Sequence, residues 1–238
     1  MGVEVLTKSA ENVRARAEMR RRGLDSVTPF FSKVLHKTRL IKGVNVGDLK
    51  KSWDVLKTVE FIEQNVSKTS PVLDIGAYAS EVLCSLHMLG FGNLTGIDLN
   101  PRLAYMPYSG TIKYIAGDFM QTTFADESFR AVTAISVFEH GFSGATILRE
   151  MSRLLEPGGY LIGSTDYWPD KIDTSGMSMF GMDWKIFSKE ELLSFVDEAA
   201  NYGLTPVGQL NFEASEKVVT CLQRQYTFAW FAFRKSLT

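Results

Sequence analysis

Three side chains that can move protons follow two apolar runs in the second half of the chain. Glu139 and His140 close the run at 129–138, and Asp166 closes the run at 160–165. A Glu-His pair is costly to bury without partners, so we expect a cleft at this point. Because histidine titrates near neutral pH, we predict His140 as a general base, oriented by Glu139 or Asp166. The alternative is that His140 packs beneath a bound cofactor and hydrogen-bonds the backbone.

A glycine turn earlier in the chain, "VLDIGAYAS", indicates a nucleotide-like ligand. Asp74 and Gly76 follow a short apolar run, but Tyr78 and Glu81 stand where a dinucleotide fingerprint has its second and third glycines. A phenol ring would block the close approach of a pyrophosphate, and a carboxylate would repel it. The turn therefore argues against NAD, FAD and a nicotinamide-dependent oxidoreductase. It suits a ligand with an ammonium and a carboxylate but no phosphate, such as S-adenosylmethionine (SAM).

Two further turns carry residues that suit a nucleoside. Asp98, followed by Leu99, lies 24 positions after Asp74, an offset at which a carboxylate can accept hydrogen bonds from both ribose hydroxyls. Asp118 can accept from an exocyclic adenine amine, and Phe119 can cover the face of a base. The alternative for each turn is an ordinary solvent-facing loop.

A long connection follows Asp166 and begins with two aromatic residues. Tyr167 and Trp168 start a segment without a clear helical or strand pattern that runs to Trp184. Long loops in compact domains are frequently lids or binding loops. We predict that Tyr167 and Trp168 form one wall for a substrate, the alternative being a surface loop packed by its own aromatic residues.

The elements that must position these residues alternate between strand and helix from residue 71 onward. Such alternation predicts an α/β fold with parallel pairing, in which ligands bind at the carboxyl ends of the strands. Amphipathic helices are predicted over 9–22 and 49–66, and Ser143 and Ser188 are predicted helix N-caps. The predicted strands lie at 71–76, 93–100, 111–118, 129–140, 160–168, 204–212 and 226–235.

Composition limits the class of protein. The 238 residues are 45% hydrophobic and 22% charged with a formal net charge of −1, which is typical of a globular domain. Residues 1–60 carry 13 Lys and Arg against seven Asp and Glu, which indicates either a solvated helical face or a patch for an anionic partner. Cys84 and Cys221 read as buried free thiols, and no metal site is predicted. No signal segment or membrane span is predicted, so the expected location is cytoplasmic.

Taken together and in order, the strand ends resemble the class I SAM-dependent methyltransferases. The resemblance covers roughly residues 50–235, and the ending "SVFEH" looks most like the small-molecule branch of the family. The stretches "WKIFSKEEL" and "YTFAWFAFRK" are similar to methyltransferases found with surface-polysaccharide synthesis. The matching motifs are "VLDIGAYAS", "GIDLN", "AGDF", "FRAVTAISVFEH" and "LLEPGGYLI".

The resemblance implies a Rossmann-like, mostly parallel, seven-stranded sheet with helices on both faces and the last strand antiparallel. We expect a methyltransferase domain over 49–238, preceded by an N-terminal helical extension over 1–48. The methionine part of SAM is expected beside Asp74, Gly76, Ala77 and Tyr78. The remaining cofactor contacts implied are Asp98 and Leu99 at the ribose, Asp118 and Phe119 at the adenine, and Ser136 beneath the sulfur.

The expected function is methyl transfer from SAM to a small-molecule acceptor, most simply a hydroxyl of a saccharide or similar metabolite. Metal-assisted O-methylation would need Asp118, Glu139 and Asp166 to converge. A catalytically inactive binding or scaffold protein is the second class of function. RNA methylation is a third, but no RNA-binding module is recognisable, which argues against a nucleic-acid partner. The sequence leaves the oligomeric state open.

Overall fold

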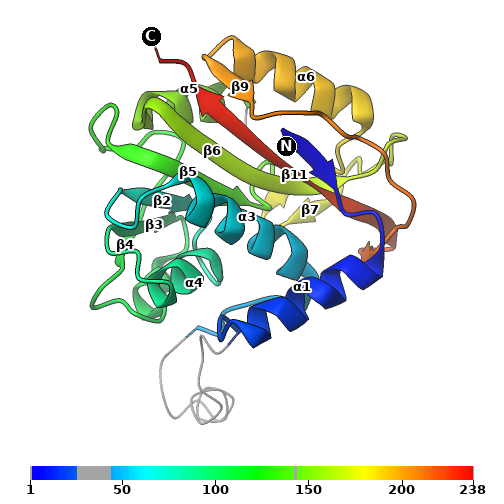
Figure 1. Ribbon diagram of the computed structural model, residues 1–238. Helices are drawn as coiled ribbons and strands as arrows, with labels where there is room; N and C mark the ends of the chain where they lie inside the picture. The colour runs from blue at the N-terminus through cyan, green and yellow to red at the C-terminus, as the bar shows by residue number, and fades with distance from the viewer. Residues whose placement is uncertain (1, 26–43, 142–143, 238) are drawn as a thin grey trace.

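The computed structural model describes residues 2–25, 44–141 and 144–237. Its centre is a mixed β-sheet with the strand order β1-β11-β6-β5-β2-β3-β4, and β9 and β10 also pair with β11 (Figure 1). Strands β7 (Ser178–Met179) and β8 (Met182–Asp183) form a separate hairpin. The sheet strands are β1 (Val3–Val5), β2 (Val72–Ile75), β3 (Leu94–Asp98), β4 (Lys113–Ala116), β5 (Phe129–Ile135), β6 (Leu155–Tyr167), β9 (Leu204–Pro206), β10 (Val219–Cys221) and β11 (Arg224–Lys235).

The strand directions confirm the expected class of sheet. Strands β4, β3, β2, β5 and β6 are parallel neighbours, whereas β11 runs antiparallel to β6. Strands β1 and β9 both pair antiparallel with the far side of β11. The sheet therefore has the predicted mostly parallel order with an antiparallel last strand, but among the described residues it holds nine strands rather than seven.

Helices cover both faces of the sheet, as predicted (Figure 1). One face carries α1, α3 and α4, and the other carries α5 and α6. The helices are α1 (Ser9–Arg21), α3 (Ser52–Asn65), α4 (Val82–Met88), α5 (Gly144–Leu154) and α6 (Lys189–Ala200), with short 3-10 turns η1 (Leu49–Lys51) and η2 (Pro101–Tyr105). In the described ranges we find no helix that is both long and apolar enough to cross a membrane.

Strand β11 shows how one sequence serves both faces. Successive side chains of a strand point to opposite sides of a sheet. Phe231 and Phe233 pack with α5 and α6, whereas Phe228 and Trp230 pack with the helices of the other face. The aromatic run "YTFAWFAF" therefore supplies both cores, which explains why nearly all of its residues are apolar.

Strand β1 was not predicted from the sequence. Val3 and Val5 are buried with 0% and 4% of their surface exposed, and β1 pairs with β11 through Val3 and Phe231. A three-residue strand is too short to show a periodic pattern, so only its partner reveals it. The division of the chain at residue 48 remains a prediction, although residues 3–5 lie in the sheet.

One of the two predicted helix N-caps lies within the described residues and can be checked. Ser188 Oγ accepts a hydrogen bond from the Glu191 backbone N–H, and the Glu191 carboxylate accepts one from the Ser188 N–H at 2.8 Å. This reciprocal pair confirms the predicted capping box of α6. The other predicted cap, Ser143, lies outside the described residues.

Candidate active site

A cavity of about 720 Å³ opens at the carboxyl ends of the parallel strands. This is the edge at which open α/β sheets bind ligands. The turns after β2, β3, β4 and β5 reach it, together with the end of β6, η1, the β7–β8 hairpin, β10 and β11. The lining residues used below are Lys51, Gly76, Tyr78, Glu81, Asp98, Leu99, Phe119, Ser136, Glu139, His140, Asp166, Met179, Phe180, Met182, Cys221, Tyr226 and Phe228.

The turn after β2 requires glycine at one position. Gly76 has a φ of +67°, and a Cβ there would lie 2.6 Å from Val137 Cγ2. The next residues close the loop, because the Tyr78 backbone N–H donates to Asp98 Oδ2 at 2.9 Å. The first glycine of the motif is therefore needed for the turn itself, and the residue in the second glycine position lines the cavity.

The Asp98 carboxylate is held in place by two backbone groups. Its Oδ2 accepts from Tyr78 N–H, and its Oδ1 accepts from Asn100 N–H at 2.8 Å. A carboxylate oxygen can accept more than one hydrogen bond, so both oxygens keep capacity for a ligand. Leu99 is 52% exposed and lines the cavity beside it. This geometry suits a ribose diol.

Two of the predicted cofactor residues lie beneath the cavity rather than on its surface. Asp74 is 1% exposed and accepts a hydrogen bond from Thr133 Oγ1 at 2.6 Å, and burial raises its pKa to about 7. Ala77 is also 1% exposed and packs against Val44 and Cys84. The structure places both residues as supports of the turn.

Of the two residues predicted to contact the adenine, one lines the cavity and the other does not. Phe119 is 3% exposed and lines the cavity. Asp118 is exposed, its carboxylate accepts the Met120 N–H at 2.8 Å, and it does not line the cavity. Because the side chain caps its own turn, the structure does not bring Asp118 to the other cofactor residues.

Glu81, in the third glycine position, is neutralised by the N-terminal helix. Its carboxylate forms a two-pronged ion pair with Arg16, at 3.1 Å for each contact, and it is 4% exposed. Burial raises the pKa of Glu81, and the Arg16 guanidinium opposes that shift. Gly47, with a φ of +98°, passes so close that a Cβ would meet the carboxylate at 2.2 Å. The glycine-poor motif is thus completed by contacts from α1 and from residue 47.

The three predicted catalytic residues lie together. Glu139, His140 and Asp166 are 1%, 8% and 4% exposed, and all three line the cavity. Ser136, just before them, has a φ of +54°, a conformation that is uncommon for a residue with a side chain and is found at functional sites. We call the group to which they belong the inner wall: Lys51, Ser136, Glu139, His140, Asp166, Tyr226 and Phe228.

The two carboxyl groups of the inner wall have different partners. Asp166 Oδ2 accepts from Trp184 Nε1 at 2.8 Å, and Asp166 Oδ1 lies 3.6 Å from Lys51 Nζ. Glu139 Oε2 accepts from Thr165 Oγ1 at 3.3 Å. Burial and the neighbouring Asp166 carboxylate raise the pKa of Glu139 to about 8, although the Lys51 ammonium opposes this shift. Glu139 is therefore mostly protonated at neutral pH.

His140 does not have the predicted orienting carboxylate. Its Nδ1 is buried without a hydrogen-bond partner among the described residues, and its ring lies edge-on to Phe180 at 5.4 Å. Burial lowers the pKa of His140, so its imidazole is neutral at physiological pH and able to accept a proton. Neither Glu139 nor Asp166 hydrogen-bonds His140 in the described part of the chain, because Asp166 is held by Trp184 and Lys51.

Lys51 and two aromatic residues of β11 are inner-wall members that the sequence did not reveal. Lys51 ends η1, and its Nζ donates a hydrogen bond to Ser136 Oγ and lies 3.4 Å above the Phe228 ring. Tyr226 and Phe228 come from the last strand, next to Asp166 in the register of β6 and β11. Sequence offered no signal, since Lys51 sits in a basic amphipathic stretch and lies 85 positions from Ser136.

The structure does not place Tyr167 and Trp168 on the cavity. Tyr167 is fully buried, and its hydroxyl donates to the Phe212 carbonyl at 2.7 Å. Trp168 lies beneath Lys217, whose Nζ is 4.8 Å from the ring centre. The side chains of Asp166 and Tyr167 point to opposite faces of β6, so only Asp166 meets the ligand edge. The β7–β8 hairpin supplies Met179, Phe180 and Met182 instead.

The two thiols lie in different environments. Cys84 is buried as predicted, and burial raises its pKa to about 12, whereas Cys221 is half-buried and lines the cavity.

The candidate metal ligands are not brought together, because Asp118 does not converge with Glu139 and Asp166. Within the described ranges, no three His, Cys, Asp or Glu side chains are grouped as metal ligands.

A family model described as a methyltransferase domain matches residues 73–163, from β2 into β6. This part of the chain is similar to the methyltransferase family. The cofactor of this family is SAM, and the match spans the Gly76 turn, Asp98 and the Glu139–His140 end of the motif.

Curated relatives align to part of this chain. The chain is 31% identical over 102 residues to sterol 24-C-methyltransferase erg-4 of Neurospora crassa, which covers 40% of this chain and 27% of that protein. It is 28% identical over 106 residues to the sterol 24-C-methyltransferase of Pneumocystis carinii, covering 41% and 28%. The alignments thus span about a quarter of the length of these relatives.

Solved structures share the fold over most of the chain. Geranyl diphosphate C-methyltransferase of Streptomyces coelicolor superposes with a TM-score of 0.58 at 14% identity, covering 90% of this chain and 95% of that one. The 1,6-didemethyltoxoflavin-N1-methyltransferase of Burkholderia thailandensis superposes with a TM-score of 0.56 at 15% identity, covering 97% and 92%. At these identities the likeness concerns the fold of the methyltransferase domain.

Proposed function

We propose that this chain transfers a methyl group from SAM to a small-molecule acceptor bound against the inner wall. One observation carries the proposal: six of the nine predicted cofactor residues line the same cavity as the three predicted catalytic residues. Asp98 and Phe119 lie toward β3 and β4, and Glu139, His140 and Asp166 lie toward β5 and β6. A cofactor bound along the first group would present its reactive end to the second.

The acceptor we propose has an apolar surface next to a polar reacting group. Met179, Phe180 and Met182 supply apolar lining, and the inner wall supplies Glu139 and Asp166. A saccharide fits this description, because the C–H face of a sugar ring packs on aromatic residues while its hydroxyls remain free to react. The relatives and fold neighbours named for sterol, geranyl diphosphate and didemethyltoxoflavin support a small-molecule acceptor in general.

In the proposed mechanism the protein positions the two reactants and accepts a proton from the acceptor. SAM, when bound, supplies a methyl group already activated on a sulfonium. His140, neutral because of its burial, would accept the proton that the acceptor hydroxyl loses when the methyl group passes from sulfur to its oxygen and the cofactor leaves as S-adenosylhomocysteine. The buried inner wall keeps water away from the reacting groups. A base in this role contributes roughly 10²–10⁴-fold to turnover, so His140→Ala should lose that factor while SAM still binds.

Binding can be tested before the acceptor is known. Calorimetric titration with SAM and with S-adenosylhomocysteine should show binding of both, and Asp98→Ala should abolish or strongly weaken it. Asp118→Ala is the matched control, because this carboxylate lies outside the cavity and its removal should leave affinity nearly unchanged. Loss of affinity in Asp118→Ala equal to that in Asp98→Ala would refute the assignment of the ribose site.

Turnover can then be tested with methyl-labelled SAM and a panel of saccharides, amines and isoprenoid alcohols, with products identified by mass spectrometry. Transfer of label to a saccharide hydroxyl would support the finer proposal. Tight SAM binding with no labelled product from any acceptor would favour the scaffold class of function instead. The cytoplasmic location remains a prediction.

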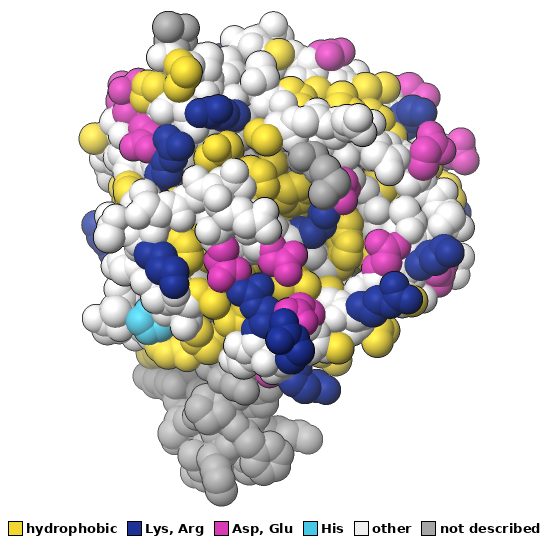
Figure 2. Space-filling model, in the orientation of Figure 1, with side chains coloured by type: hydrophobic (Ala, Val, Ile, Leu, Met, Phe, Trp, Pro, Cys, Tyr) yellow, Lys and Arg dark blue, Asp and Glu magenta, His cyan; other side chains and the backbone are white. Residues whose placement is uncertain are grey.

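The N-terminal arginines give little support to a nucleic-acid substrate. Arg16 pairs with Glu81, and Arg22 pairs with Glu63, so two of the basic groups of this region are engaged within the chain. Figure 2 shows Lys and Arg side chains interspersed with Asp and Glu on the face that carries α1. We therefore retain a small molecule, rather than RNA, as the proposed acceptor.

A further inference from the structure

Lys51 brings a positive charge to a wall that otherwise holds acidic and neutral groups. Its Nζ donates to Ser136 Oγ, lies 3.6 Å from Asp166 Oδ1 and sits 3.4 Å above the centre of the Phe228 ring. An aromatic face, a carboxylate and a hydroxyl are groups that stabilise an ammonium or a sulfonium ion. The inner wall therefore already surrounds a cation, one that belongs to the chain itself.

The inner wall and the nearby Asp54 together hold more carboxyl groups than the single ammonium group of Lys51 can neutralise. Asp54, Glu139 and Asp166 are 0%, 1% and 4% exposed and all face Lys51. Burial raises the pKa of Asp54 to about 6 and that of Glu139 to about 8, and Lys51 opposes both shifts. The titratable and charged groups around Glu139 are Lys51 on η1, His140 beside it, Asp166 on β6 and Tyr226 on β11.

We propose that the inner wall selects SAM over its product S-adenosylhomocysteine by charge, with Glu139 as counter-ion and Lys51 as the opposing cation. The inference rests on the proposed function, in which the reactive end of the cofactor lies beside Ser136. The two ligands share one skeleton, but only SAM carries a positive charge on sulfur. A charge on the wall therefore changes the affinity for SAM and leaves that for the product nearly unchanged.

The proposal gives Lys51 a defined role. Asp166 keeps a positive partner in Lys51 whether or not a cofactor is bound, so the wall does not bury an unpaired charge. The positive charge of Lys51 disfavours the sulfonium, and ionised Glu139 favours it. Lys51 is thus a specificity-determining residue for the cofactor, and its effect should appear in the dissociation constant of SAM, while that of the product stays nearly unchanged.

The test is calorimetric titration of full-length protein with SAM and with S-adenosylhomocysteine at pH 8.5. Lys51→Met should raise the preference for SAM over product by about tenfold, and Glu139→Gln should lower it by about tenfold. The matched control is Lys50→Met, since Lys50 is the adjacent lysine, lines the same cavity and is exposed to solvent. Its screened charge should change the ratio by less than twofold.

Product binding also reports on folding, because each variant should bind S-adenosylhomocysteine as the unaltered protein does. An unchanged ratio in both Lys51→Met and Glu139→Gln would overturn the inference while leaving the proposed function intact. A change in Lys50→Met as large as that in Lys51→Met would also overturn it, since the effect would then be a general one of net charge. Failure of the unaltered protein to bind either ligand would reject the proposed function, and this inference with it.

Discussion

At the scale of single residues, burial determines the protonation states of the titratable side chains in the inner wall. Glu139 and His140 are neighbours in sequence, yet burial raises the pKa of the first and lowers that of the second. Both shifts favour the neutral form, because desolvation penalises charge of either sign. At neutral pH the pair therefore offers a protonated carboxyl and a neutral imidazole, and a cation brought near them will favour ionisation of the carboxyl.

This arrangement predicts how SAM affinity depends on pH. Below pH 8 Glu139 is mostly protonated and must release its proton to act as a counter-ion, so SAM affinity should rise as pH increases through about 8. Affinity for S-adenosylhomocysteine should lack this rise. Calorimetry between pH 6.5 and 9, in buffers with different heats of ionisation, should detect proton release for SAM alone. Parallel pH curves for the two ligands, or a SAM rise that persists in Glu139→Gln, would contradict this prediction.

Gly76 supports a second prediction at this scale. In Gly76→Ala the new Cβ would meet Val137 Cγ2 at 2.6 Å in a backbone with a φ of +67°. We expect a loss of about 1–3 kcal/mol in the free energy of unfolding and weaker SAM binding, because the turn carries Tyr78. Gly92→Ala is the control, since a Cβ there meets nothing within 4 Å. Chemical denaturation and calorimetry measure the two effects, and equal losses in both variants would argue against the steric cause.

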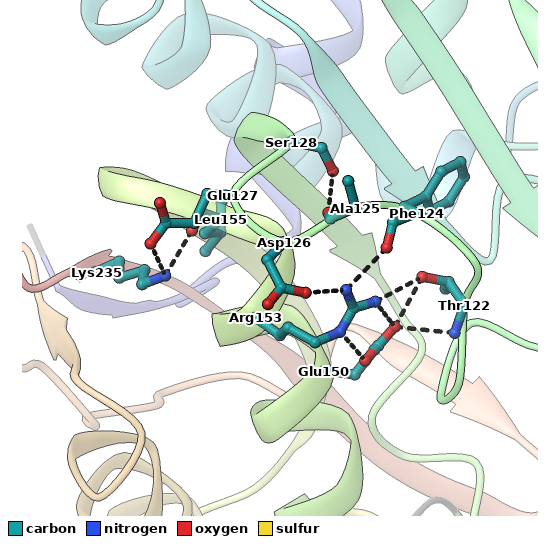
Figure 3. Close-up of polar contacts among 10 residues, drawn as sticks. All are labelled: Thr122, Phe124, Ala125, Asp126, Glu127, Ser128, Glu150, Arg153, Leu155 and Lys235. Carbon is teal, nitrogen blue, oxygen red and sulfur yellow. Dashed lines mark hydrogen bonds and ion pairs between the residues drawn. The ribbon is translucent and has the colours of Figure 1, made fainter.

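At the scale of elements, helices are anchored to the sheet through a few polar side chains. Figure 3 shows Arg153, near the end of α5, reaching Glu150 and the segment 122–126 that leads into β5. Burial alone would raise the pKa of Glu150, but hydrogen bonds from Arg153 and Thr122 outweigh it and hold the pKa below its ordinary value. The arginine therefore joins a helix to a loop that lacks regular backbone pairing.

Arg153→Met should weaken this anchor. The guanidinium donates to Phe124 O at 2.8 Å and to Glu150 Oε1 at 2.7 Å, and its removal leaves the mostly buried Glu150 carboxylate short of donors. We expect a loss of about 1–2 kcal/mol in the free energy of unfolding, measured by urea denaturation. Arg149→Met, an exposed arginine on the same helix, should change stability by less than about 0.5 kcal/mol. A similar loss in both variants would show that the polar cluster contributes little.

At the scale of the whole molecule, the N-terminal segments join distant parts of the chain. Strand β1 extends the sheet beside β11, and α1 packs on α3 while holding the cofactor turn through Arg16 and Glu81. Residues 3–21 therefore contribute to both the sheet and the turn after β2. This placement accounts for the half-buried Arg16 of a helix whose sequence is mostly polar.

The ion pair between Arg16 and Glu81 should couple stability to cofactor binding. Arg16→Met would leave the buried Glu81 carboxylate unpaired, at a cost of about 2–4 kcal/mol in unfolding free energy and with weaker SAM binding. Adding Glu81→Gln should recover part of both losses, because the unpaired charge is then gone. Arg21→Met serves as control, since Arg21 is exposed and pairs with Glu18 on its own helix. Additive losses in the double variant would exclude the coupling.

Much of the site could be predicted because its residues follow local patterns. Gly76, Asp98, Phe119, Ser136, Glu139, His140 and Asp166 each lie at the end of an apolar run, and parallel strands bring such ends to one edge. Alternation of strand and helix likewise predicts the parallel sheet and its two covered faces. These features depend on short-range sequence, so the sequence by itself determined them.

The tertiary structure decided the rest, because contacts between distant segments leave no periodic signal. Lys51 meets Ser136 across 85 positions, and Arg16 meets Glu81 across 65. The direction of a side chain is also a matter of register: Asp166 faces the cavity, whereas Tyr167, the next residue, is buried on the other side of β6. The local sequence predicts where each strand ends. The packing of the sheet and its helices determines which side chains reach the site and which charged groups lie close together there.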